Sequence, residues 1–519
     1  MLPHSISKLL LTGVCVMASV PAAAAACTDL ARLAMDTVAI TQAESREAGT
    51  FEQELGPEVS LPAHCRVAAV LSPTDDSHIE MELWLPEDWN GRFLALGNGG
   101  WAGNISFGAM ARGLQSGYAV ASNDTGHKGG SAAFAVGHPE KVVDFAWRAM
   151  HEMAVHSKRM IEAYYEQPPT QSFYQGCSTG GRQGLIEAQR FPADFDAIIV
   201  GAPVNNQLTL NATQLHNMKR LIENRALALS PAKVQLLHDA VLAACEADDG
   251  VEDGILNDPL ACDFDPESLQ CDGGDGAACL TAAEVSAVED VYAGVHSSDG
   301  ELIYPGHAKG FELGWRIPEA GSEPTALQID ATRYLVYEDP DWNWREFELE
   351  RDLALARDKA GYIEALGADL GEFKARGGKL LIYHGWNDPG PSPLNSIGYY
   401  DEVLATMGPD QDDWLRLYLM PGMGHCRGGI GPDQADFLGA VEAWIESGSA
   451  PDRITASRIR EGQVDMTRPL CPYPEVAAWD GEGNPDDAAS YTCRATPAAQ
   501  AQERQRTPDA TSVAPGTGR

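Results

Sequence analysis

One serine and one histidine of this chain each stand beside a cysteine, and together they could perform nucleophilic catalysis. The serine is Ser178, in the run Gly176-Cys177-Ser178-Thr179-Gly180, and the histidine is His425, in Gly424-His425-Cys426. Glycines two positions before and after a serine permit the sharp strand-to-helix turn that exposes a nucleophilic hydroxyl. A histidine within reach takes the proton of such a hydroxyl and later returns it to the leaving group. The alternatives are an ordinary glycine-rich turn and an exposed loop histidine.

A loop aspartate, Asp388, lies between these two residues in the chain and follows an apolar run. An aspartate can orient a catalytic histidine and stabilise its imidazolium form. The order Ser178, Asp388, His425 is that of α/β-hydrolase triads. Because Asn387-Asp388-Pro389-Gly390 is rich in turn formers, an ordinary turn aspartate is the alternative.

Acyl transfer also needs hydrogen-bond donors for the developing oxyanion. One is expected to be the backbone N–H of Thr179, directly after the nucleophile. The other is expected from the glycine loop at 97–100, most simply from Gly100, with Gly99 as the alternative. Trp101, next to this loop, could line a pocket or belong to the core.

The segments that must position these residues alternate between strand-like and helix-like patterns. Short apolar runs predict strands at 92–96, 118–122, 172–176, 197–201, 379–384 and 416–420, and helical periodicity appears at 145–165 and from 184 to 189. Such alternation predicts an α/β fold with a parallel sheet and crossover helices. We therefore predict an α/β-hydrolase fold.

The alternation stops between about residues 203 and 367, where the sequence is polar, aromatic and cysteine-bearing. Long insertions between core elements commonly carry function. We predict a discontinuous catalytic domain at 27–203 and 368–494 and an inserted lid domain at 204–367. The tail at 495–519 is rich in Ala, Gln, Pro and Thr and is predicted to be disordered.

Residues 1–26 are predicted to be a signal peptide, because a short apolar stretch precedes the small residues Ala22–Ala26. The chain has 11 cysteines, and with Cys15 in the signal peptide an even number, 11 − 1 = 10, remains. Export and an even count favour disulfides over free thiols. Proximity favours the pairs Cys245–Cys262, Cys271–Cys279, Cys471–Cys493 and Cys27–Cys65, which leaves Cys177 for Cys426. This is one preferred solution among many, and it predicts a secreted or periplasmic protein.

The formal net charge of −38 bears on possible partners. A strongly acidic surface is repelled by phosphate backbones and anionic lipids, which argues against nucleic acid and anionic membranes. The N-terminal apolar stretch is too short for a membrane span, and none is predicted elsewhere.

An acidic loop at 245–255, CEADDGVEDGI, has carboxylates interleaved with glycines. Carboxylate and backbone oxygens suit a hard cation such as Ca²⁺. The spacing is not that of an EF-hand. A solvated acidic turn is the alternative, although a Cys245–Cys262 bridge would close the loop and favour a structural ion.

As a set, these motifs resemble the tannase and feruloyl esterase family, which also includes mono(2-hydroxyethyl) terephthalate hydrolase. The matching segments are GCSTGGRQ at 176–183, GHC at 424–426 and GGKLLIYHGWND at 377–388. The likeness covers nearly the whole mature chain, up to about Arg494. It implies that Ser178, Asp388 and His425 form a triad and that Cys177 and Cys426 are disulfide-bonded.

The resemblance also implies a structural Ca²⁺ in the lid, with side-chain ligands from Glu246, Asp249 and Asp253 and backbone oxygens from Val251 and Ile255. The first ligand is usually aspartate, so Glu246 is a departure that could leave this contact to Asp248.

Family lids bind the aromatic acyl part of the ester, and Trp315, Arg333 and Tyr337 are the lid candidates here. Arg333 could pair with a substrate carboxylate or serve as a structural ion-pair partner.

The predicted function is hydrolysis of aromatic acid esters by a secreted serine carboxylesterase of the feruloyl esterase type. Its expected partner is a small aromatic ester, free or attached to plant polysaccharide or polyphenol. Tannase-like or terephthalate monoester-like specificity is the alternative. More distant alternatives are a peptidase or lipase, and a non-catalytic protein that binds an aromatic glycoside.

Overall fold

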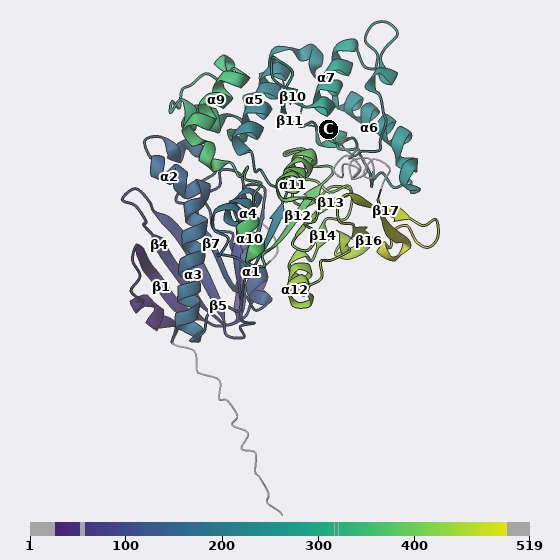
Figure 1. Ribbon diagram of the computed structural model, residues 1–519. Helices are drawn as coiled ribbons and strands as arrows, with labels where there is room; N and C mark the ends of the chain where they lie inside the picture. The colour runs from purple at the N-terminus through teal and green to yellow at the C-terminus, as the bar shows by residue number, and fades with distance from the viewer. Residues whose placement is uncertain (1–25, 52–57, 316, 320, 496–519) are drawn as a thin grey trace, which may run out of the picture.

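The fold is built on one nine-stranded sheet with the strand order β1-β4-β5-β7-β6-β8-β9-β12-β13 (Figure 1). The computed structural model describes residues 26–51, 58–315, 317–319 and 321–495. The sheet consists of β1 (Val38–Arg46), β4 (His64–Leu71), β5 (Ile79–Pro86), β7 (Ala119–Asn123), β6 (Arg92–Leu96), β8 (Gln171–Cys177), β9 (Ala197–Gly201), β12 (Lys379–Gly385) and β13 (Leu415–Met420). The six strands from β7 to β13 run parallel, whereas β1, β4 and β5 pair antiparallel at one edge.

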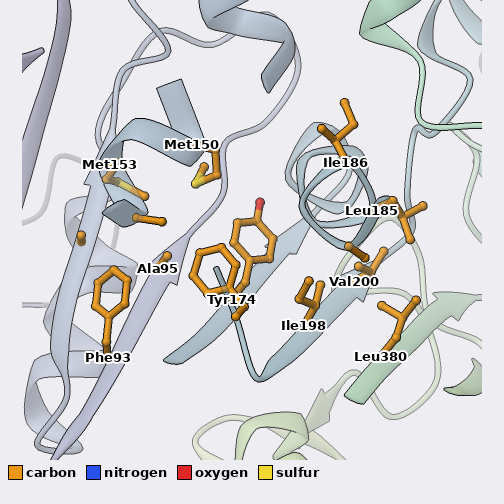
Figure 2. Close-up of a cluster of buried hydrophobic side chains, with 14 of the residues drawn as sticks. Phe93, Ala95, Met150, Met153, Tyr174, Leu185, Ile186, Ile198, Val200 and Leu380 are labelled. Atoms are coloured by element: carbon orange, nitrogen blue, oxygen red, sulfur yellow. The ribbon is translucent and has the colours of Figure 1, made fainter. Parts of the chain in front are cut away.

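Both faces of the parallel strands are buried because successive side chains alternate between two apolar layers. In β6, Phe93 and Ala95 belong to one layer, and Leu94 and Leu96 belong to the other. Figure 2 shows the first layer, where side chains from four strands meet Met150 and Met153 of α3 (Ala149–Tyr165). Leu185 and Ile186 of α4 (Thr179–Arg190) close the same layer. This packing fixes α4, which begins directly after Ser178, against the sheet.

The helices divide between the two faces of the sheet and the segment inserted after β9. Those outside the insertion are α1 (Phe107–Gln115), α2 (Pro139–Val143), α3, α4, α11 (Pro393–Met407) and α12 (Phe437–Ser447). Side chains of α3, α4 and α11 pack in the first layer, and those of α1 and α12 pack in the second. The sheet is therefore covered by helices on both faces, as the sequence predicts for an α/β fold.

The segment between β9 and β12 leaves the sheet and forms a mainly helical unit, drawn in teal and green in Figure 1. Its elements are α5 (Gln207–Glu223), α6 (Pro231–Cys245), α7 (Ala282–Ala293), β10 (Val295–His296), β11 (Leu302–Tyr304), α8 (Ala326–Asp330), α9 (Leu349–Ala360) and α10 (Gly371–Ala375). This is where the sequence predicts the inserted lid. The polar composition of the segment concealed its helices, because buried polar residues such as Gln207, Thr209 and Asn211 interrupt the apolar pattern of α5.

The remaining strands form small sheets. These are β2 (Gly49–Phe51) with β3 (Val59–Leu61), β14 (Gln434–Ala435) with β15 (Ile454–Arg460) and β16 (Gln463–Leu470), and β17 (Glu475–Trp479) with β18 (Tyr491–Ala495). The predicted signal peptide and C-terminal tail lie outside the described residues, apart from Ala26 and Ala495. No helix in the described ranges is long and apolar enough to cross a membrane.

Five disulfide bonds join the ten cysteines of the described chain. They are Cys27–Cys65, Cys177–Cys426, Cys245–Cys262, Cys271–Cys279 and Cys471–Cys493. Four of them close loops of 8 to 38 residues, whereas the Cys177–Cys426 bond spans 249 residues. The long-range bond thus connects the two halves of the sheet across the insertion.

Candidate active site

Ser178 stands at the sharp turn between β8 and α4, with a backbone φ of 65°. A positive φ is uncommon for a residue with a side chain and is held only where the surroundings fix it. Its neighbouring glycines provide the room. A Cβ on Gly176 would meet the carbonyl oxygen of Gly180 at 2.6 Å, and one on Gly180 would meet that of Asn98 at 2.8 Å. The glycine spacing in the sequence therefore has a steric cause.

His425 lies in the loop after β13 and is hydrogen-bonded to Asp388, in the turn after β12. His425 Nδ1 donates to Asp388 Oδ2 at 2.7 Å. The donor must be the nitrogen, because an ionised carboxylate only accepts. This leaves His425 Nε2 as the acceptor nitrogen of a neutral imidazole.

Asp388 is completely buried, and its charge is stabilised by several donors. Burial by itself raises the pKa of Asp388, but hydrogen bonds from His384 and His425 outweigh it and hold the pKa well below its usual range. Gly390 N–H donates to the other carboxylate oxygen at 2.8 Å. Asp388 therefore stays ionised beside His425.

His384, at the end of β12, is a second histidine on Asp388 that the sequence reasoning treated only as a strand residue. Its Nε2 lies 3.2 Å from Asp388 Oδ2 and 3.1 Å from the carbonyl oxygen of Pro391, and its Nδ1 lies 2.7 Å from Ser396 Oγ. The sequence feature that could have indicated this role is a polar residue at the end of an otherwise apolar strand, four positions before Asp388. His384 therefore shares Asp388 Oδ2 with His425.

The Cys177–Cys426 bond connects the residues next to the serine and the histidine. Its Cα atoms are 6.1 Å apart, and Ser178 and His425 both line one cavity. Cys426, like Ser178, has a positive φ, here 62°. The bond thus holds two strained loops in fixed relation on both sides of the cavity.

We expect the double substitution Cys177→Ala/Cys426→Ala to lower kcat about 100-fold, because an ångström of misplacement between reacting groups has effects of this size. The measurement is kcat per folded molecule, with the folded fraction taken from circular dichroism at the assay temperature. The double variant Cys271→Ala/Cys279→Ala, which opens an eight-residue loop, is the matched control. Unchanged turnover in a folded Cys177→Ala/Cys426→Ala protein would contradict this role.

The glycine loop after β6 is fixed to α4 by paired side-chain contacts. Gln183 Oε1 accepts from the backbone N–H of Asn98 at 3.0 Å, and Gln183 Nε2 donates to Asn98 Oδ1 at 3.1 Å. Thr179 Oγ1 donates to the carbonyl oxygen of Gly100 at 2.9 Å. Gly100, with a φ of 57°, lines the same cavity as Ser178 and Thr179. Trp101 belongs to the core, where it is 1% exposed and stacks on Phe145.

The cavity has a volume of about 370 Å³ and lies between the sheet ends and the inserted segment. Of the three predicted acyl-binding residues, Trp315 lines it. Arg333 and Tyr337 are not among its described lining residues. The Tyr337 hydroxyl instead donates to Asp352 at 2.6 Å, and its ring stacks on Trp342. The segment Ala331–Val336 packs against α9, which carries Asp352, and Tyr337 follows this segment directly.

The structure places carboxamides in the cavity that the sequence reasoning missed. Gln207, Asn211 and Gln214 follow one another on one face of α5 and all line the cavity. Gln207 Oε1 and Asn211 Oδ1 are buried, and neither has a hydrogen-bond partner in the described structure. Buried oxygens without a donor are costly, which makes these two oxygens candidate acceptors for a hydrogen bond from a substrate.

Cationic groups near the cavity are few. The described basic residues that line it are Arg220, His307 and His425. Arg220 is paired with Asp290 at 2.6 Å, and burial lowers the pKa of His307 to about 4. His307 is therefore neutral near pH 7, and the described lining offers no unpaired permanent cation to a substrate carboxylate.

The predicted calcium loop offers only oxygen ligands, which suits a hard cation. Asp249 Oδ1 and Oδ2 accept from the backbone N–H groups of Val251 and Asn257 at 3.0 and 3.2 Å. Burial raises the pKa of Asp249 to about 6. Within the described part of the chain, the neighbouring Asn257 Oδ1 is buried without a hydrogen-bond partner.

The other two predicted carboxylates lie in the same loop. Glu246 accepts from the N–H of Gly254. Asp253 accepts from the N–H of Ile255 at 3.1 Å and pairs with Arg468 of β16. The donor set fits the ion that the family resemblance implies.

Comparison with known proteins agrees with this architecture. The family model described as tannase and feruloyl esterase matches residues 65–494. An uncharacterized esterase of Xanthomonas campestris pv. campestris is 35% identical over 92% of each chain. A probable feruloyl esterase B-2 of Aspergillus terreus is 35% identical over 83% of this chain and 86% of its own. The crystal structure of feruloyl esterase B from Aspergillus oryzae superposes with a TM-score of 0.84 at 30% identity, over 90% of this chain and 99% of that one. The chain therefore belongs to the tannase and feruloyl esterase family and is a carboxylic-ester hydrolase with an α/β-hydrolase fold.

Proposed function

We propose that this protein is a secreted serine esterase that hydrolyses esters of uncharged, hydroxylated aromatic acids. One observation supports the catalytic part above all. Ser178 and His425 line the same cavity, and a disulfide bond connects the cysteines next to them. His425 is in turn hydrogen-bonded to the buried Asp388 at 2.7 Å.

In the proposed reaction, Ser178 Oγ attacks the ester carbonyl while His425 Nε2 accepts its proton. The imidazolium that forms is stabilised by Asp388, which stays ionised. His425 then gives the proton to the departing alcohol, and an acyl-enzyme remains on Ser178. Water, activated by the same histidine, hydrolyses the acyl-enzyme and restores the serine.

The oxyanion would be held by the backbone N–H groups of Thr179 and Gly100. Thr179 is the first residue of α4, so its N–H has no acceptor within the helix. The positive end of the helix dipole adds to the stabilisation of negative charge at this position. The hydrogen bond between Thr179 Oγ1 and the Gly100 carbonyl keeps the two segments together before substrate arrives.

The acyl group is proposed to be phenolic, as in hydroxycinnamic or hydroxybenzoic acids. Trp315 and Phe311 provide apolar surface against which an aromatic ring can pack. The side-chain oxygens of Gln207 and Asn211, which have no partner in the described structure, can accept hydrogen bonds from ring hydroxyls. The pairing of Arg220 with Asp290 disfavours an acyl group with a free carboxylate, such as a terephthalate monoester. The physiological ester is proposed to be carried on plant polysaccharide or polyphenol.

We expect Asn211→Leu to lower kcat/KM for a hydroxylated ester such as methyl ferulate at least 10-fold, because a buried hydroxyl would lose its acceptor. The same variant should change kcat/KM for the unsubstituted methyl cinnamate by less than threefold. Lys219→Leu, on the same helix but outside the cavity, is the control. An equal loss on both esters would show that Asn211 does not recognise the hydroxyl.

The proposed function is tested by assaying purified protein on methyl ferulate, methyl gallate and mono(2-hydroxyethyl) terephthalate. We expect turnover of a phenolic ester and much slower turnover of the terephthalate monoester. If none of the three is hydrolysed by folded protein whose Ser178 reacts with a phosphonate probe, the substrate class is wrong and the esterase assignment stands. Hydrolysis of tributyrin or casein alone would favour a lipase or peptidase, and an unlabelled Ser178 would favour a non-catalytic binding protein.

We further propose that the acidic loop holds a structural Ca²⁺ through Glu246, Asp249 and Asp253, with backbone oxygens from Val251 and Ile255. When bound, the ion would neutralise these half-buried carboxylates and fix the loop to the C-terminal strands. Val251 already packs beside the Cys471–Cys493 bond.

Removal of calcium with EGTA should lower Tm by about 5 °C, because a ligand that binds only the folded state stabilises it by a few kcal/mol at saturation. Readdition of Ca²⁺ should restore Tm, whereas Asp249→Asn should abolish the response. We expect kcat at 25 °C to stay within twofold, since none of the five proposed ligands lines the active-site cavity. A Tm that is insensitive to EGTA and Ca²⁺ would refute the site.

Secretion or export to the periplasm is proposed from the N-terminal signal-like segment together with the five disulfides. Disulfides persist in oxidising compartments and are rare in the cytosol.

A further inference from the structure

A second cluster of ligating side chains lies away from the active-site cavity, at the far end of α4. It consists of His151 from the first turn of α3, Glu187 from the last turn of α4, and Asp194 from the loop that leads to β9. One ligand atom from each lies within 4.8 Å of the others. The cluster is about 13 Å along the helix from Ser178, since a helix rises 1.5 Å per residue.

Glu187 is the unusual member of the cluster. Its side chain is fully buried, and neither carboxylate oxygen has a hydrogen-bond partner in the described structure. Its neighbours in sequence are core residues, and Figure 2 shows Leu185 and Ile186 inside the apolar layer. An acidic side chain at such a position requires compensation, because a buried charge without a partner is strongly unfavourable.

The group nearest to Glu187 is another carboxylate. Burial, followed by the charge of Asp194, raises the pKa of Glu187 well above its usual range. Two carboxylates in contact are stable only with a proton or a cation between them. The nearby ammonium of Lys158 donates to the backbone carbonyl of Asp194, and its charge only partly offsets the rise in the pKa of Glu187.

His151 adds a nitrogen ligand to the two carboxylates and leaves a route to solvent. Its ring stacks on Phe191 with a centroid distance of 3.9 Å, which fixes the direction of Nδ1. Nδ1 lies 2.6 Å from Asp194 Oδ2. The His151 side chain is 28% exposed, so an ion can reach the cluster past the imidazole without opening the core.

We propose that His151, Glu187 and Asp194 bind one divalent transition-metal ion of the Zn²⁺ or Mn²⁺ type. One imidazole nitrogen with two carboxylates is a donor set that suits these ions, whereas Ca²⁺ prefers oxygen ligands alone. Metal–ligand distances of about 2.0–2.2 Å hold tetrahedral ligand atoms farther apart than the 2.6 Å between His151 Nδ1 and Asp194 Oδ2, so these two atoms must separate slightly as the ion enters. The remaining positions are taken by water.

Binding exchanges protons for the metal. His151 Nδ1 gives up its proton and carries the imidazole proton on Nε2 instead, and Glu187 releases its proton to solvent. The ion then joins α3, α4 and the loop before β9. Because α4 begins at Ser178, the site would stabilise the element that presents the nucleophile, and it takes no part in the chemistry.

The proposal is tested by titrating the full-length, tag-free protein with Zn²⁺ in saturating Ca²⁺, which keeps the acidic loop occupied. Calorimetry gives stoichiometry and affinity, Co²⁺ absorption reports an imidazole–carboxylate environment, and thermal unfolding reports stabilisation. We expect one equivalent to bind and Tm to rise. Glu187→Gln, which copies the neutral protonated state, and His151→Ala should each weaken binding at least 10-fold and abolish the rise in Tm.

His138→Ala is the matched control, because His138 forms an exposed pair with Asp76 at 2.7 Å and has no buried carboxylate beside it. It should bind Zn²⁺ like the unmodified protein. If the unmodified protein binds no Zn²⁺, or if Glu187→Gln and His151→Ala bind it equally well, the proposal is wrong. A shared proton between Glu187 and Asp194 then explains the cluster. None of these readouts depends on ester hydrolysis.

Discussion

Ser178→Ala should reduce kcat for a phenolic ester by about 10⁴- to 10⁶-fold, while the protein stays folded. Loss of a serine nucleophile has effects of this size because the remaining triad residues act only through it. The residual rate would come from substrate binding and from the Thr179 and Gly100 N–H groups. The measurement is kcat on methyl ferulate, together with labelling by a fluorescent phosphonate, which should vanish.

Ser157→Ala is the matched control for this substitution. Ser157 is fully buried, lies in α3 away from the active-site cavity and has no hydrogen-bond partner for its hydroxyl in the described structure, so its removal should leave kcat unchanged. If Ser178→Ala keeps more than about 1% of kcat while its circular dichroism spectrum is unaltered, another nucleophile performs the reaction.

Asp388→Asn should reduce kcat by about 10⁴-fold, the effect known for removing the carboxylate that orients a catalytic histidine. The geometry gives a specific reason. Gly390 N–H donates to Asp388 Oδ1, whereas His384 and His425 both meet Oδ2. The amide oxygen of an asparagine must therefore face Gly390, which turns its NH₂ group toward the two histidines. His425 Nδ1 then has to accept, its proton moves to Nε2, and Nε2 can no longer take the proton of Ser178.

Asp352→Asn controls for the loss of a buried carboxylate as such. Asp352 is 1% exposed and accepts from Tyr337 within the inserted segment. This variant should lose stability but keep kcat per folded molecule. If Asp388 fixes the tautomer of His425, kcat of Asp388→Asn should be low at every pH near neutrality. Equal kcat for Asp388→Asn and the unmodified protein would show that His425 needs no orientation by Asp388.

The local features of the site were readable from the sequence because each depends on a short stretch of chain. The glycines at 176 and 180 predict the turn at Ser178, and the structure shows that a Cβ at either position would collide with backbone. The apolar runs predict the parallel strands and hence the α/β-hydrolase fold. The antiparallel strands β1, β4 and β5 were not predicted, because their pairing depends on the sheet edge that they extend and not on a local pattern.

The substrate pocket could not be read in this way, because its walls come from segments that meet only in the folded lid. Tyr337 carries the right chemistry for an aromatic pocket, but its hydroxyl donates to Asp352 of α9 within the inserted segment. Gln207 and Asn211 look like ordinary helix residues until the fold closes over them and leaves their oxygens without donors. The same holds for His384, which becomes a partner of Asp388 only when the turn after β12 folds back.

The sequence by itself therefore determined the kind of chemistry this protein can perform, since the turn at Ser178 and the residues that flank it are fixed by local sterics and by residue type. The tertiary structure alone decided which polar groups face the cavity, which histidines share Asp388, and that Glu187 meets Asp194 and His151 at the far end of α4. Several of those contacts join positions far apart in the chain, such as His425 with Asp388, and the short-range one between His384 and Asp388 forms only in the folded turn. Only packing, which minimises exposed apolar surface and unpaired polar groups across the whole chain, selects them.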